Sequence, residues 1–164
     1  MEISDDGLAY LCGGEMDFAE FCLDITSDDL DPKDITEALG VEPTYCHRKG
    51  QTNRTGKAVY KFGRWQLSTG RRDSRSRSSV YEAFDAFIRT LPGAEAPWEQ
   101  INSKHNARIM VTLWMRTWNR EFDLSSFALS ELGRRGLRLH FDTYLEPDDP
   151  AGEPAEGDTR PRSA

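Results

Sequence analysis

Apolar and polar residues alternate along several stretches of this chain, and a period of two is typical of half-buried β-strands. Alternation or short β-rich runs cover residues 18–26, 58–62, 64–69, 107–116 and 137–145. The 107–116 stretch is largely apolar on both sides, so we place that strand in the centre of the sheet, partly covered on both faces. The pattern therefore predicts about five strands.

Helical signals separate these strands. Asp31 is a suitable N-cap for a helix that has Pro32 in its first turn and ends at Gly40. Residues 79–91 carry an apolar stripe behind a capping-box spacing of serine and glutamate. A further helix is predicted over 125–135, and a short helical turn over 98–103.

The order of these elements predicts an α+β fold: a mostly antiparallel sheet of about five strands with helices packed on one face. Residues 21–40 and 110–133 repeat the order strand, polar turn, helix, Leu-Gly, which predicts a ferredoxin-like pseudo-repeat. We expect one domain over residues 18–145, an irregular leader over 1–17 and a disordered acidic, Pro-rich tail over 146–164.

Charge is unevenly distributed along the chain. From Arg48 to Arg77 there are ten basic residues and one acid, Asp73, a net charge of +9, whereas the rest of the chain carries −16. Residues 44–57 and 70–78 are predicted loops, from which cations reach outward. Such a segment favours an anionic partner, and the alternatives are that it pairs within the protein with the acids from Asp28 to Glu42 or serves solubility. The residues expected to bind that partner, with Trp118 as an exposed anchor, are Arg48, Lys49, Arg64, Arg71, Arg72, Arg75, Arg77 and Trp118.

Several short motifs occur in one order along the chain: Leu30-Asp31-Pro32, Arg48-Lys49-Gly50, Gly63-x-Trp65-x-Leu67-Ser68-Thr69, Leu129-x-x-Leu132-Gly133 and Asp142-x-Tyr144. In this combination the chain resembles a bacterial family catalogued as domain of unknown function 4279, over roughly residues 18–145. The resemblance implies no settled activity, cofactor or substrate, and only a loose association with immunity or regulatory proteins. The Arg/Ser-rich run of residues 70–78 is a departure from the family pattern.

The residues that could carry chemistry are sparse. Cys46 and His47 are adjacent, and a folded-back metal site would need a distant third ligand such as His140. No Gly-x-Ser-x-Gly elbow or phosphate-cradling glycine loop occurs. We therefore expect no catalytic residues, no metal and no cofactor. Trp65 and Trp114 fall on predicted strands among apolar residues, so we expect both in the core.

These observations favour a non-enzymatic binding module, of an immunity or regulatory type, that binds an acidic protein surface. One alternative is a nucleic-acid-binding domain that uses the basic 48–77 segment. Another is a small-ligand or enzymatic domain with a sheet–helix pocket near His47, His140 or Tyr144. The three cysteines, without C-x-x-C spacing, and the acidic start predict a cytoplasmic protein. No apolar run is long enough for a membrane span.

Overall fold

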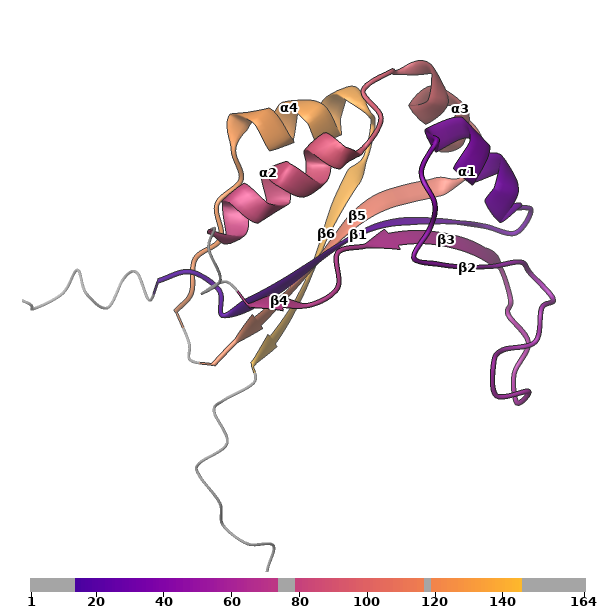
Figure 1. Ribbon diagram of the computed structural model, residues 1–164, viewed down its shortest axis with the longest axis horizontal. Helices are drawn as coiled ribbons and strands as arrows, with labels where there is room; N and C mark the ends of the chain where they lie inside the picture. The colour runs from indigo at the N-terminus through magenta and orange to yellow at the C-terminus, as the bar shows by residue number, and fades with distance from the viewer. Residues whose placement is uncertain (1–13, 74–78, 117–118, 146–164) are drawn as a thin grey trace, which may run out of the picture.

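The computed structural model describes residues 14–73, 79–116 and 119–145. In them a six-stranded mixed sheet carries four helices, all on the same face (Figure 1). The elements are β1 (Phe18–Ser27), α1 (Pro32–Leu39), β2 (Tyr45–His47), β3 (Gly63–Ser68), β4 (Arg72–Asp73), α2 (Val80–Thr90), α3 (Ala96–Lys104), β5 (Asn106–Met115), α4 (Ser126–Arg134) and β6 (Arg138–Leu145).

The main path of the sheet has the order β2-β3-β1-β5-β6. The short strand β4 pairs with β1 near its start, whereas β3 pairs with the later residues of β1. Every pairing is antiparallel except the one between β5 and β6, which is parallel. The α+β class and the mostly antiparallel sheet are thus confirmed.

Two strands lie where the sequence predicts loops. β2 falls within residues 44–57, and β4 falls within residues 70–78. Conversely, the predicted strand over 58–62 is wrong, because that segment makes only an isolated bridge between Thr52 and Val59. Strands of two or three residues hold too few alternating positions to show a period, so only their long-range partners define them.

The core lies between the sheet and the helices. Phe21, Leu23 and Ile25 of β1 point into it and are fully buried, as the alternation predicts. Phe21 meets Phe84 of α2 in an edge-on contact, with 5.0 Å between the ring centroids. Trp65 of β3 is also fully buried, and its indole nitrogen donates to the Thr36 hydroxyl of α1. These contacts join β1 and β3 to two different helices.

The helix boundaries follow the sequence signals. The Asp31 side chain accepts a hydrogen bond from the backbone of Lys33, and Gly40 ends α1 in the left-handed conformation at φ 64°. Ser79 and Glu82 form the complete capping box at the start of α2. The predicted turn over 98–103 is a nine-residue helix, α3. In the described part of the chain, no helix has both the length and the apolar character needed to cross a membrane.

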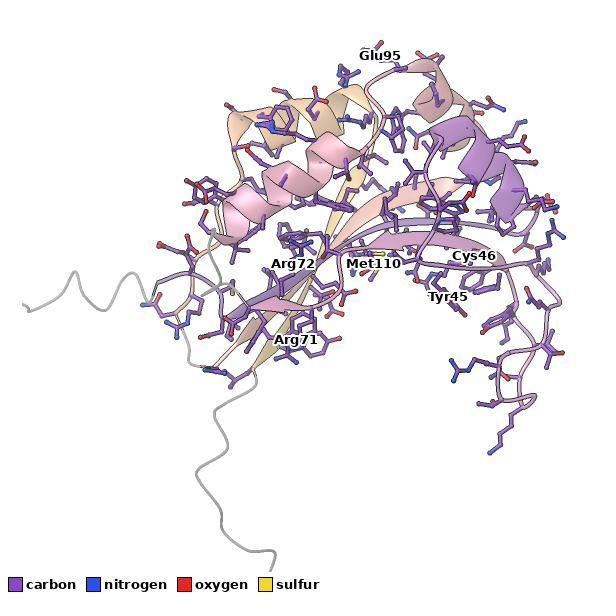
Figure 2. The ribbon with its side chains drawn as sticks, viewed as in Figure 1. Tyr45, Cys46, Arg71, Arg72, Glu95 and Met110 are labelled. Atoms are coloured by element: carbon purple, nitrogen blue, oxygen red, sulfur yellow. The ribbon has the colours of Figure 1, made fainter. Side chains whose placement is uncertain are left out.

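The second face of the sheet, which we call the open face, has none of the described helices packed on it (Figure 1). Figure 2 shows Tyr45 and Arg71 on this side, away from the helices. Trp114 belongs to it as well, because it pairs with Phe18 in register and is only partly buried. The expectation that Trp114 lies in the core is therefore wrong, since neighbouring rings and not helices cover it.

The start of β3 depends on a glycine. A Cβ atom at Gly63 would lie 2.7 Å from the Leu30 carbonyl oxygen and 2.9 Å from the Leu30 Cβ. We therefore expect Gly63→Ala to lower the free energy of unfolding by about 1–3 kcal/mol, measured by urea denaturation. Gly133→Ala is the control: no atom lies within 4 Å of a Cβ there, and alanine inside α4 should add about 0.5–1 kcal/mol. Equal effects of the two substitutions would contradict this account.

Candidate functional site

The basic segment begins with two cations that the protein itself neutralises. Arg48 Nη2 lies 2.6 Å from an Asp31 carboxylate oxygen, and Lys49 Nζ lies 2.7 Å from Asp28. The Arg48 guanidinium is the main cause of the lowered pKa of Asp31. These pairs attach the chain after β2 to the N-terminus of α1. The Arg48 and Lys49 side chains both remain about half exposed, so their docking role stays a prediction beside this anchoring one.

Arg64, one of the predicted binding residues, pairs with a carboxylate of the protein itself. Its Nε donates to Asp24 Oδ1 at 2.6 Å, and its Nη2 donates to Asp24 Oδ2 at 3.1 Å. Arg108 of β5 binds the same carboxylate from the other side, with Nη2 at 2.9 Å from Oδ2. Arg108 Nε and the Gln66 amide nitrogen donate to the same carboxylate, each at 3.1 Å. Asp24 is fully buried on the open face by these side chains.

The electrostatics of Asp24 follow from these contacts. Burial alone raises the pKa of a carboxyl, but the hydrogen bonds and charges of Arg64 and Arg108 outweigh it and hold the pKa of Asp24 below 3.8. The neighbouring Cys22 thiol is affected in the opposite direction. Burial, followed by the Asp24 and Glu20 charges, raises its pKa to about 12. Cys22 is therefore a neutral thiol at pH 7 and a poor nucleophile.

Between β2 and β3 the chain forms a protruding segment, residues 48–62, which we call the arm (Figure 1). It contains five basic residues and no acid. Inside the arm, Gly50 and Tyr60 are joined by a backbone hydrogen bond, and the Asn53 side chain accepts from the backbone nitrogens of Lys57 and Ala58. The arm is thus a hairpin-like loop with its own turn.

Aromatic rings brace the base of the arm. His47 stacks on Tyr60 with 3.6 Å between ring centroids, and the Tyr45 hydroxyl donates to the Tyr60 hydroxyl at 2.7 Å. His47 is buried, and among the described residues its Nδ1 has no hydrogen-bond partner. Burial is the main cause of its lowered pKa, so the ring is neutral at pH 7. A neutral stacked ring holds the arm without adding charge.

Unpaired charge and apolar surface occur together along the arm. Arg54, Lys57 and Lys61 form no ion pair with any residue in the described ranges. Val59 and Phe62 belong to the same segment and are 58% and 40% exposed. Sequence patterns alone do not distinguish these five residues from their neighbours. Their only signal is the acid-free run of the arm, which forms part of a longer basic segment.

The later cations of the basic segment lie in different environments. The Arg71 guanidinium lies over the rings of Phe18 and Trp114, 4.2 and 4.6 Å from their centroids. Trp114 in turn stacks on Tyr144 of β6. Arg72 is exposed on β4. The remaining predicted binding residues, Arg75, Arg77 and Trp118, lie outside the described residues.

The candidate metal and pocket residues are far apart. His47 is on β2 and His140 is on β6, and these strands form opposite edges of the sheet. Tyr144 lies on the β6 edge too, where its hydroxyl donates to Asp142. In residues 14–73, 79–116 and 119–145, no three metal-ligating side chains come together. The arrangement therefore offers surfaces for binding and does not bring these residues into one reactive centre.

Comparison with known families agrees with this order of elements. The model of a family described as "Domain of unknown function (DUF4279)" matches residues 18–146. The chain belongs to the DUF4279 family. No curated protein and no solved structure matches it. The DUF4279 domain thus spans every strand and helix of the described chain, from the start of β1 to the end of β6.

The Asp24 cluster makes a stability prediction for this DUF4279 domain. Asp24→Asn leaves Arg64 and Arg108 without their counter-charge, and we expect a loss of about 2–3 kcal/mol at pH 7, less than for a fully buried pair because both arginines are partly exposed. A lowered folded-state pKa stabilises above the unfolded value of about 4, and this contribution disappears as the pH falls through the folded-state pKa. Urea unfolding at pH 7, 5, 4 and 3 should show the difference from wild type shrinking at the acid end.

Asp123→Asn is the matched control, because Asp123 is exposed. We expect its denaturation midpoint to stay within experimental error of wild type. If Asp24→Asn also left the midpoint unchanged at pH 7, the cluster would have no role in stability.

Proposed function

We propose that this DUF4279 domain is a non-enzymatic binding module, of a regulatory or immunity type, that docks an acidic protein surface with its arm. The observation that carries the proposal is the surface of the arm. Along it, three cations that have no ion pair among the described residues occur together with exposed Val59 and Phe62. Positive charge beside an apolar anchor suits a partner that presents carboxylates around an apolar depression.

The rest of the molecule supports this assignment to the arm. The chain carries a net charge of −7, so the acid-free arm is a local exception on an acidic body. Arg48 and Lys49 fasten its base to α1, which lowers the entropy lost when the tip is held by a partner. A cytoplasmic location, expected from the cysteine pattern, fits a module that meets its partner inside the cell.

A second candidate function has one specific observation in its favour. Phe18, Trp114 and Tyr144 form a row of rings on the open face, with Arg71 lying over two of them. Rings and guanidinium groups on an open sheet are the surface on which unpaired bases of single strands stack. We keep nucleic-acid binding as this second candidate, at the opposite end of the open face from the arm.

We also propose that the fold contains an internal repeat of a strand–helix–strand unit. β1, α1 and β2 form one strand–helix–strand unit, because two successive antiparallel pairings make β2 parallel to β1. β5, α4 and β6 form a second unit with a parallel return. In the first unit β3 is inserted between the two parallel strands, as in a split βαβ motif. This supports the ferredoxin-like pseudo-repeat, with β3 as the difference between the halves.

The test of the function uses charge reversal at the tip. We expect Arg54→Glu/Lys57→Glu to slow association with a protein captured from the source cells by about tenfold or more, because the steering charge is inverted. The association rate constant of the purified pair, measured at several salt concentrations, should also become less salt-dependent. Labelled single-stranded RNA and DNA probes run in parallel test the second candidate.

The matched control is Lys33→Glu/Lys104→Glu, which makes the same change in net charge on α1 and α3. This variant should associate nearly as fast as wild type. Equal slowing in both variants would mean that net charge and not the arm controls docking, and the proposal would then be wrong.

A further inference from the structure

Two guanidinium groups stand side by side on the open face because one carboxylate holds both of them. Asp24 on β1 binds Arg64 of β3 and Arg108 of β5. These strands flank β1 on its two sides. The two arginine side chains are 27% and 29% exposed, whereas Asp24 is not exposed at all. Solvent therefore meets the arginines and not the acid between them.

Most hydrogen-bond donors of this pair remain available. An arginine has five N–H donors. The bonds to Asp24 use only the Nε and Nη2 atoms of each guanidinium, and among the described residues nothing else accepts from either group. Their Nη1 atoms, together with the second Nη2 hydrogens, are left for a ligand. Because Asp24 fixes both planes, these donors do not have to be ordered when a ligand arrives.

A third arginine, Arg138, lies on the strand next to Arg108. Arg138 of β6 is the register partner of Arg108 in the parallel pairing, so both side chains project from the same face. It is exposed, and it donates to the Asn106 side chain. Three guanidinium groups and one carboxylate give this cluster a net charge of +2. We call Arg64, Arg108 and Arg138, with Asp24 beneath them, the arginine cluster.

Other carboxylates on the open face lie further along the strands. Glu20 is four residues from Asp24 on β1, about 13 Å away along the strand, and it accepts a hydrogen bond from Ser68. Asp142 is four residues from Arg138 on β6 and is bound to the Tyr144 hydroxyl. Neither carboxylate cancels the local charge of the cluster, which therefore attracts a small dianion.

We propose that the arginine cluster is a binding site for a phosphate monoester group. A phosphate monoester carries a charge of about −1.5 to −2 at pH 7, close to the opposite of the cluster. Its three terminal oxygens accept hydrogen bonds from the paired N–H groups of guanidinium in a bidentate way. A carboxylate has one charge and two oxygens, so it satisfies less of the cluster. The site is separate from the arm and does not depend on the function proposed for it.

The test titrates inorganic phosphate into the ¹⁵N-labelled full chain and follows backbone amide and arginine Nε–Hε signals by NMR. We expect saturable shifts at the three arginines, and much smaller shifts with acetate at equal ionic strength. Arg138→Gln should weaken phosphate binding by about tenfold, the loss of one charged hydrogen-bonded contact. Because Arg138 is exposed, this variant retains the Asp24 pairs and the fold.

The control is Arg54→Gln, the same chemical change on the arm, which should leave phosphate affinity unchanged. Equal weakening in both variants, equal shifts with acetate, or saturable shifts confined to the arm would each overturn the proposal. Phosphoserine and a nucleoside 5′-monophosphate, titrated in the same way, identify the carrier: the tighter of the two at the same arginines is the class to pursue. Arg54→Gln retains this binding even if the arm has no partner, so the two proposals fail separately.

Discussion

The structure depends on one buried carboxylate with two arginine partners. Asp24 sits in the middle of β1, and its hydrogen bonds cross to both neighbouring strands, β3 and β5. Removing a carboxylate from water costs free energy, so a buried, ionised carboxylate is stable only where all of its partners are in place. A register slip of one residue in β1 would turn Asp24 into the apolar core and expose Phe21, Leu23 and Ile25. The cluster therefore specifies the register of the three central strands.

The pairing of Arg64 with Asp24 also shows that not every cation of the basic segment is available to a partner. A net charge of +9 over residues 48–77 reads as one positive face, but the fold uses its cations for different purposes. Arg48 and Lys49 fasten the arm, Arg64 neutralises Asp24, and Arg71 lies over aromatic rings. Among the described residues, the charge that remains free is local, as on Arg54, Lys57 and Lys61 of the arm. The net charge of a basic run in the sequence therefore gives only the maximum positive charge that its surface can present. The fold decides how much of that charge a partner can reach.

The sequence predicts those parts of the fold that local physics controls. The capping box of α2, the Asp31 cap and the alternation of Phe21, Leu23 and Ile25 each depend on neighbours a few residues away. Asp24 shares the same alternation and reads as a solvent-facing residue. Its burial arises from the long side chain of Arg108, which is 84 residues away. The sequence does not predict β2, β4 or the order of the strands for the same reason. Their pairing partners are distant in sequence, so the pairing produces no periodic pattern of apolar residues.

A sheet with helices on one face only must keep its other face compatible with water. Among the described residues, long arginines and aromatic rings line that face. The partly exposed Arg64 and Arg108 supply hydrogen-bond donors there, and Asp24 fixes their positions. The arm projects on this same side of the sheet, away from the helices (Figure 1). The recognition that we propose for this DUF4279 domain therefore uses the side opposite the helical layer, where Asp24 fixes the donors of two guanidinium groups.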